Sequence, residues 1–218
     1  MCLYFTDMKV DKIITLIKER VGNNSELPGW TSHRKMAVIP INNITQKAFI
    51  SPKGAKQASV GIVVFQENNK LFFLLTKRTE NVEHHKGQVS LPGGAIEKNE
   101  SAMDASLRET YEEIGIDSST LRILGELSSL YTPVSHFNIH VFLWYSNTKP
   151  DISIDNNEVE KVYKISFDEL TNNNLVTHTP ISKSGIKINV PAYHFNECIC
   201  WGATAMILTE LKDLIKEL

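Results

Sequence analysis

The sequence predicts a mixed α/β or α+β domain. Segments with a strand pattern stand on both sides of segments with a helical pattern along the chain, which is the arrangement of that class. The length of 218 residues suits one domain with a short extension. The chain has no internal repeat and no low-complexity tract, and its hydrophobic and charged fractions, 42% and 22%, are ordinary for a globular protein.

The amino-terminal part is expected to be one helix followed by an irregular segment. Across residues 10–21, apolar side chains recur with a helical period, and a Gly-Asn-Asn sequence follows as a stop. Residues 27–56 contain three prolines and no regular pattern. We therefore expect residues 1–56 to form an extension that packs on a main domain of residues 57–218.

The main domain begins with two runs of strand type, residues 59–66 and 71–77. Four polar residues separate them, so they are predicted to form a hairpin. A loop over residues 78–94 then leads into a helix over residues 101–114. Gly115 stands where glycine commonly ends a helix.

The remaining expected elements are three strands and two helices. The final helix is expected to be amphipathic, because apolar residues from Met206 to Leu218 recur at helical spacing. The expected strands are residues 123–130, 136–145 and 187–195, and the expected helices are residues 166–171 and 204–217.

Three carboxylates, Glu109, Glu112 and Glu113, crowd one turn of the predicted helix at residues 101–114. Like charges at helical neighbour spacing repel one another. A hard divalent cation such as Mg²⁺ reverses that effect, because it prefers oxygen ligands and carries the compensating charge. An acidic helix face is more often simply a solvated surface, so the cluster alone only suggests a metal site that serves phosphate chemistry.

The neighbours of these carboxylates favour the metal site. Pro92-Gly93-Gly94 supplies a tight turn in which backbone carbonyls can approach a cation closely. Arg108 lies four residues before Glu112 and eight after Glu100, so it could pair with either carboxylate and hold it in place. The apolar residues Met103, Leu107 and Ile114 are expected on the buried side of the helix.

The whole segment resembles the Nudix box. The residues that carry the resemblance are Gly94, Glu100 and the run Arg108-Glu109-Thr110-Tyr111-Glu112-Glu113-Ile114-Gly115-Ile116. Thr110 stands where the family pattern has an aliphatic residue, a departure that leaves the chemistry untouched. The resemblance implies a Nudix-type α/β/α sandwich with a central mixed β-sheet. It also implies Mg²⁺- or Mn²⁺-dependent cleavage of a nucleoside diphosphate linked to another group.

The flanking segments resemble the coenzyme A pyrophosphatase branch of that family. The segments concerned are residues 74–78, His85-Lys86-Gly87-Gln88, Leu91-Pro92-Gly93-Gly94, Asn157-Glu158-Val159 and residues 201–205. Coenzyme A or its thioesters would then be the substrates, and 3′,5′-ADP and phosphopantetheine the products. Two departures, Glu83 for arginine and Leu91 for phenylalanine, leave ADP-ribose, dinucleotides or damaged nucleotides as alternative substrates.

The resemblance also implies roles for single residues. Glu109, Glu112 and Glu113, with the carbonyl of Gly93 or Gly94, would hold one or more cations. Glu158 is expected to be the general base, with Glu112 as the alternative, and Arg108 to orient the catalytic carboxylates. The positively charged Arg78, Lys77 and Lys86 would face the substrate phosphates, and His85, Gly87 and Gln88 complete the expected substrate-binding set.

Charge and composition bear on the partners. A net charge of −2 gives no general attraction to nucleic acid or to anionic membranes, so we expect a small nucleotide as the partner. The apolar runs are too short to span a bilayer and no signal peptide is recognisable, so we expect a cytoplasmic protein. Cys198 and Cys200 alternate along a strand-like segment, which favours buried reduced thiols.

Two further alternatives stay open in the sequence. The helix over residues 10–21 could dock on its own domain or on a second subunit, which would give a homodimer. A Nudix-like module that binds a nucleotide without hydrolysing it would be expected to carry a degraded box, whereas this chain keeps every carboxylate of the box. It also has no basic stripe of the kind that a DNA-bound regulator needs.

Overall fold

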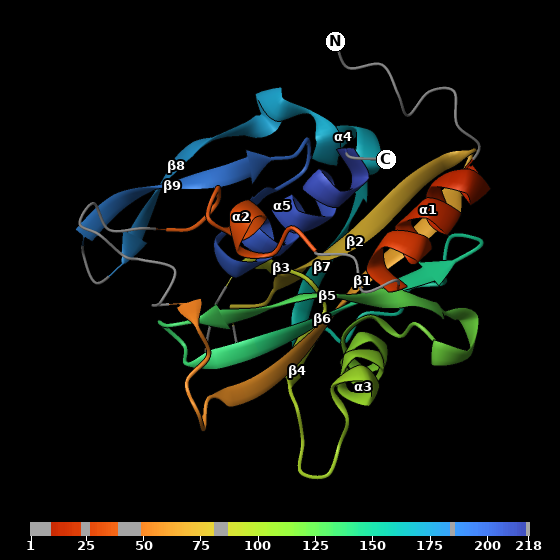
Figure 1. Cartoon of the computed structure of the whole chain (residues 1–218), viewed down its shortest axis with the longest axis horizontal. Helices are drawn as coiled ribbons and strands as arrows, with labels where there is room; N and C mark the ends of the chain where they lie inside the picture. The colour runs from red at the N-terminus through yellow and green to blue at the C-terminus, as the bar shows by residue number, and fades with distance from the viewer. Residues whose placement is uncertain (1–9, 23–26, 39–48, 81–86, 184–185, 217–218) are drawn as a thin grey trace.

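A mixed seven-stranded sheet forms the centre of the computed structural model, which describes residues 10–22, 27–38, 49–80, 87–183 and 186–216 (Figure 1). Its strands are β1 (Lys56–Glu67), β2 (Lys70–Arg78), β3 (Val89–Ser90), β4 (Gly93–Ala95), β5 (Arg122–Thr132), β6 (Phe137–Ser146) and β7 (Val159–Ser166). β1 and β2 form the predicted hairpin, and β1 pairs in parallel with β6. The order is β3-β2-β1-β6-β5, with β7 also paired to β2 and β4 to β1.

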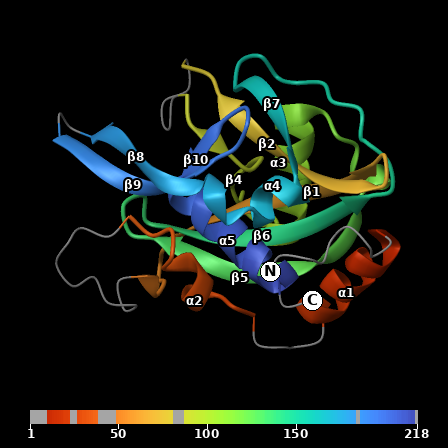
Figure 2. The ribbon, with the colours of Figure 1, turned by 90° about the horizontal axis from the view of Figure 1, so that it is seen from above.

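Helices lie on both faces of this sheet, as Figure 1 and Figure 2 together show. α3 (Ala102–Ile114) lies on one face, and α1 (Val10–Gly22) and α5 (Gly202–Lys216) lie on the other. Two separate hydrophobic clusters correspond to the two faces, one that includes Ile114 of α3 and one that includes residues of α1 and α5. The predicted sandwich of helices around a mixed sheet is therefore confirmed.

Strand β2 shows how alternation divides side chains between the two faces. Phe73 and Leu75 are part of the cluster under α1 and α5, whereas Phe72 and Leu74 contact the cluster under α3. The same alternation carries on to the end of the strand. Lys77 and Arg78 must therefore point to opposite faces, and only Arg78 points toward α3.

A second, smaller sheet stands beside the first. It consists of the antiparallel strands β8 (Val176–Lys183), β9 (Ile186–His194) and β10 (Ile199–Trp201). Cys198 and Cys200 at β10 are buried and unbonded, and burial raises the pKa of both thiols, that of Cys198 to about 12. The prediction of buried reduced thiols is therefore confirmed.

Several short elements differ from the sequence-based expectation. The segments expected to be irregular contain α2 (Trp30–His33), β3 and β4, and the strands β7 and β8 were not expected. β7 carries the charged residues Glu160, Lys161 and Lys164, which interrupt its apolar pattern. The remaining helical elements are α4 (Phe167–Thr171), as predicted, and the short 3₁₀ turns η2 (Ser118–Thr120) and η3 (Asn173–Leu175).

The segment that contains α2 is attached to α5 through a buried carboxylate. Glu210 of α5 has no exposed surface, and its Oε1 accepts hydrogen bonds from the backbone N–H of Gly29 (3.1 Å) and of Ser128 (3.3 Å). Nε2 of His33 lies 2.8 Å from Oε2 of the same carboxylate. One side chain thus joins the amino-terminal segment, β5 and α5.

The length and polarity of the helices determine whether any of them could cross a membrane. Within the part of the chain that the structure describes, no helix is long and apolar enough to cross a membrane.

Candidate functional site

The helix that carries the carboxylates has well-defined ends. The hydroxyl of Ser101 accepts the backbone N–H of Asp104 at 3.1 Å and caps the amino terminus. Gly115 follows the last turn with φ 70°, the left-handed conformation that glycine adopts without strain, so the predicted helix end is confirmed. Within the helix, Ser106 and Thr110 lie against Gly61 of β1, where a Cβ would come within 3.1 Å of both hydroxyls. This close approach sets the distance from α3 to the sheet.

The three predicted metal ligands lie on adjoining positions of α3 but in different surroundings. The side chain of Glu113 is 2% exposed, that of Glu109 14% and that of Glu112 56%. The carboxylate-bearing face of α3 is therefore buried near the sheet, at Glu113, and exposed to solvent at Glu112. Met103, expected on the buried side, is instead 43% exposed, because the sheet lies further round the helix.

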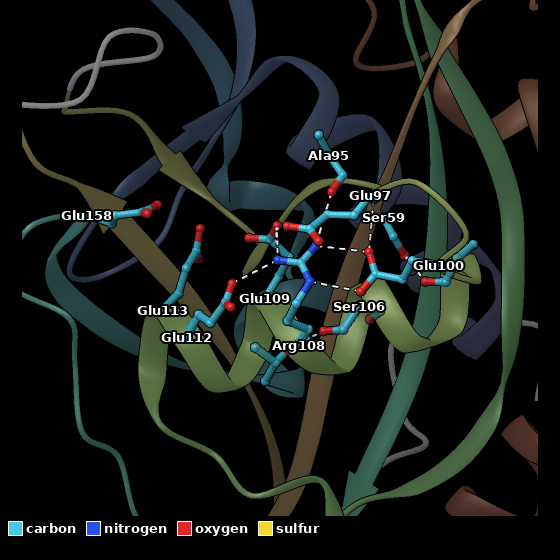
Figure 3. Close-up of polar contacts among 12 residues, drawn as sticks. Ser59, Ala95, Glu97, Glu100, Ser106, Arg108, Glu109, Glu112, Glu113 and Glu158 are labelled. Atoms are coloured by element: carbon cyan, nitrogen blue, oxygen red, sulfur yellow. Dashed lines mark hydrogen bonds and ion pairs between the residues drawn. The ribbon is translucent and has the colours of Figure 1, made fainter.

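Arg108 holds two of these carboxylates and the box residue Glu100 (Figure 3). Its Nη1 donates to Glu109 and to Glu112, each at 2.8 Å, and its Nε donates to Glu100, also at 2.8 Å. Nη2 donates to Glu100 and to the carbonyl of Ala95, both at 3.1 Å. Both pairings that the spacing predicted are present, and Arg108 fixes the carboxylates in one arrangement.

The glycine pair at β4 brings the backbone directly against this cluster. Gly93 and Gly94 pair with Val60 and Ser59 of β1. A Cβ at Gly94 would overlap the carboxylate oxygens of Glu109, and a Cβ at Gly93 would overlap the carbonyl of Ser59. Glycine is therefore needed at Gly93, where the overlap is with backbone, and at Gly94 it leaves the Glu109 carboxylate in its place.

Arg78 brings a second group of residues to Glu113. Its Nη1 donates to Oε1 of Glu113 at 3.1 Å, and its Nη2 donates to Oε2 of Glu158 at 3.4 Å. The loop before β7 that carries Glu158 is fixed by backbone hydrogen bonds to the end of α3. These are Ser153 N–H to Ile114 O (3.0 Å) and Asp155 N–H to Glu113 O (3.1 Å).

Thr79 attaches the same loop to β2. Its backbone N–H donates to the carbonyl of Glu158 (2.9 Å) and its hydroxyl to the carbonyl of Asn157 (2.8 Å). The sequence offered no signal for this role, since nothing in a single threonine marks a contact to a loop so far along the chain. Thr79 is thus a positioning residue that sequence reasoning missed.

Burial governs the charge state of the two inner carboxylates. It raises the pKa of Glu113 to about 8, which Arg78 only partly offsets, and it also raises the pKa of Glu109. Among the described residues, Oε2 of Glu113 is one of two buried side-chain atoms without a hydrogen-bond partner. An orphaned carboxylate oxygen near a second, partly buried carboxylate fits a divalent cation, which would supply the missing charge.

The described carboxylate side chains of this site are not arranged as a set that surrounds a metal ion. Within the described ranges, no three Asp, Glu, His or Cys side chains converge closely enough to enclose a metal ion. The cause is visible in the contacts above: Arg108 draws Glu112 and Glu109 to one side, and Arg78 draws Glu113 to another. The assignment of Glu109, Glu112, Glu113 and the Gly94 carbonyl to a cation stays a prediction.

The predicted substrate-binding residues are only partly brought together. Lys77 donates to Glu160 at 2.7 Å on the face opposite Arg78, so it does not face the carboxylate cluster. The carbonyl of Gln88 accepts the backbone N–H of Arg78 at 3.0 Å, which places Gly87-Gln88 beside it. His85 and Lys86, like Glu83, lie outside the described residues.

The known proteins to which this chain is similar belong to one family, the one whose sequence motif the carboxylate cluster resembles. The family model described as the NUDIX domain matches residues 55–184. The chain is 34% identical over 100 residues to Nudix hydrolase 3 of Caenorhabditis elegans, covering 44% of this chain and 42% of that protein. It is 27% identical over 146 residues to the Nudix hydrolase NudL of Photorhabdus laumondii, covering 66% and 76%.

Solved structures show the same fold. A Nudix hydrolase from M. smegmatis, RenU, superposes with a TM-score of 0.54 at 12% identity, covering 75% of this chain and 88% of that one. The MutT protein of Methanosarcina mazei Go1 gives a TM-score of 0.50 at 16% identity, covering 75% and 96%. At such low identity these likenesses concern the fold alone.

Proposed function

Because this chain belongs to the Nudix family of pyrophosphohydrolases, we propose that it hydrolyses the pyrophosphate bond of coenzyme A or one of its thioesters. The observation that carries the proposal is the carboxylate cluster of α3, joined by Arg78 to Glu158 across the site. The flanking residues that resemble the coenzyme A branch point to the substrate. The products would be 3′,5′-ADP and phosphopantetheine, or its acyl form from a thioester.

The roles of the residues follow from their positions. A divalent cation, Mg²⁺ or Mn²⁺, held by Glu109, Glu112, Glu113 and the Gly94 carbonyl would neutralise phosphate oxygens and acidify the attacking water. Arg108 keeps the carboxylates in place through its charged hydrogen bonds. Glu158, half exposed at the edge of the cluster, accepts the proton of that water.

A substrate panel tests the proposal. The protein is incubated with Mg²⁺ or Mn²⁺ and coenzyme A, ADP-ribose, NADH, diadenosine polyphosphates or oxidised nucleoside triphosphates. We expect kcat/KM for coenzyme A to exceed that for any other member by roughly tenfold, about the discrimination that one or two specific contacts provide. A preference for ADP-ribose would contradict the substrate assignment, and no turnover of any member would favour a nucleotide-binding module.

The alternative substrates rest on the two departures from the branch signature. Leu91 is buried in the core between the sheet and α5, so its difference from phenylalanine concerns packing and not a substrate contact. Glu83 is the departure that keeps ADP-ribose, dinucleotides and damaged nucleotides in the panel.

The role of Glu158 is tested by Glu158→Gln. We expect turnover to fall about 100-fold, at the lower end of what general base catalysis contributes, while Mn²⁺ affinity stays within about threefold. The matched control is Glu160→Gln, two residues further on, where an exposed carboxylate pairs with Lys77 on the other face. If Glu158→Gln turned over substrate at nearly the rate of the control variant, the role of general base would be assigned to Glu112 instead.

A further inference from the structure

Arg78 contacts two of the carboxylates that the proposed reaction uses. It pairs with Glu113, whose side chain is almost fully buried, and with the half-exposed Glu158. The Arg78 side chain is itself 23% exposed, so it lies at the boundary between the buried carboxylate and solvent. A cation that binds Glu113 would therefore meet Arg78 at the same carboxylate.

The position of Arg78 is fixed by the strand and not by its side-chain contacts alone. It ends β2 on the face toward α3, and its backbone N–H donates to Gln88. The pairing of β2 with β7 shifts register between Lys77 and Arg78, so that Glu160 is the extra residue of an irregularity next to the site. Such irregularities re-aim side chains, and this one separates the Lys77–Glu160 pair from Arg78.

We propose that Arg78 and the divalent cation compete for the Glu113 carboxylate, and that the displaced guanidinium binds the pyrophosphate of the substrate. This rests on the proposed function, in which Glu113 is a cation ligand. Oε1 of Glu113 accepts Arg78 and Oε2 has no partner among the described residues, so a cation would lie within a few ångströms of the guanidinium. Two positive charges at that distance repel strongly in a buried site.

The second half of the proposal follows from the shape of the guanidinium. Its planar set of N–H donors matches two phosphate oxygens at once, as it matches carboxylates. Arg78 is partly exposed and tethered to the end of a strand, so it can turn from Glu113 to a bound phosphate without movement of the backbone. The cation therefore frees the substrate-binding residue as it binds.

Mn²⁺ binding measured without substrate tests the competition. Free Mn²⁺ is followed by electron paramagnetic resonance under anaerobic conditions at pH 9, for the wild type, Arg78→Gln and the control Lys161→Gln. The control removes one positive charge from an exposed pair with Glu197. We expect Arg78→Gln to bind Mn²⁺ about tenfold more tightly, because it lacks the competing charge, and Lys161→Gln to match the wild type within about twofold.

A steady-state measurement at saturating Mn²⁺ tests the transfer to substrate. Arg78→Gln is expected to raise KM for the best substrate at least about tenfold, the loss of a charged hydrogen-bond pair to phosphate. Mn²⁺ affinity that is unchanged or weaker in Arg78→Gln would overturn the competition. Tighter Mn²⁺ binding with an unchanged KM would overturn the transfer.

Both outcomes are separable from the substrate assignment. Mn²⁺ affinity requires no substrate, so it reports on Arg78 even if the preferred pyrophosphate compound is not coenzyme A. Circular dichroism establishes that Arg78→Gln is folded. If it is not, Arg78→Lys keeps a more strongly hydrated charge that pairs less well with Glu113, and a smaller gain in Mn²⁺ affinity is expected.

Discussion

Glu113→Gln should lower turnover by at least about 100-fold while the protein stays folded. Glu113 is the most buried carboxylate of the cluster, and its free oxygen is the atom best placed to bind a cation. An uncharged amide of the same shape removes the charge and replaces one ligand oxygen by an NH₂ group, and with them the electrostatic stabilisation of the transition state is lost. Steady-state hydrolysis of the best panel substrate at saturating cation measures the effect.

The stability of the same variant separates a chemical role from a structural one. Burial raises the pKa of Glu113 to about 8, above that of an unfolded glutamate. Protonated Glu113 therefore makes its full contribution to the free energy of unfolding below about pH 4.5, and this contribution is lost as the pH rises through about 8. At pH 8 in EDTA, Glu113→Gln should accordingly melt no lower than the wild type.

Two results would contradict the assignment of Glu113. Unchanged turnover would show that the cation is held elsewhere. A large drop in melting temperature would show that Glu113 serves the packing of α3, so that any loss of activity is indirect.

Glu210→Ala should destabilise the fold by about 3–5 kcal/mol, because each buried polar group that loses its hydrogen-bond partner costs about 1–3 kcal/mol. The substitution leaves the N–H groups of Gly29 and Ser128 and the ring of His33 without their common acceptor in a dry environment. Urea unfolding, followed by circular dichroism, measures the change in the free energy of unfolding.

The control for Glu210→Ala is a carboxylate that is paired at the surface. Asp168 lies 3.0 Å from Lys70, and both side chains are more than half exposed. Asp168→Ala should change the free energy of unfolding by less than about 1 kcal/mol. An equally small change for Glu210→Ala would mean that the amino-terminal segment contributes little to the stability of the domain.

Local spacing predicted the parts of the site that lie on one helix. The pairing of Arg108 with Glu112 and Glu100 follows from distances of four and eight residues, and the helix end follows from Gly115. The separate exposures of the three carboxylates did not follow. They depend on which side of α3 the sheet lies. The apolar pattern placed Leu107 and Ile114 correctly on that side but Met103 wrongly.

Contacts between distant segments were beyond the reach of such patterns. Arg78 meets Glu113 and Glu158 across 35 and 80 residues of chain, through a sheet whose order a single sequence does not reveal. Strand β7, which sets the position of Glu158, was missed because its charged residues hide the apolar alternation. Glu158 could be suggested as a base from resemblance, but its position opposite Glu113 required the fold.

The loop that carries Glu158 bonds its neighbours through its own main-chain atoms. The carbonyl of Glu158 accepts from Thr79, and the N–H groups of Ser153 and Asp155 donate to the end of α3, so none of these bonds uses the side chain of residue 158. The residue at this position can therefore be exchanged without moving the loop. Evolution could replace the acid, or add a different functional group, at one point of the rim while leaving the cation-binding helix undisturbed.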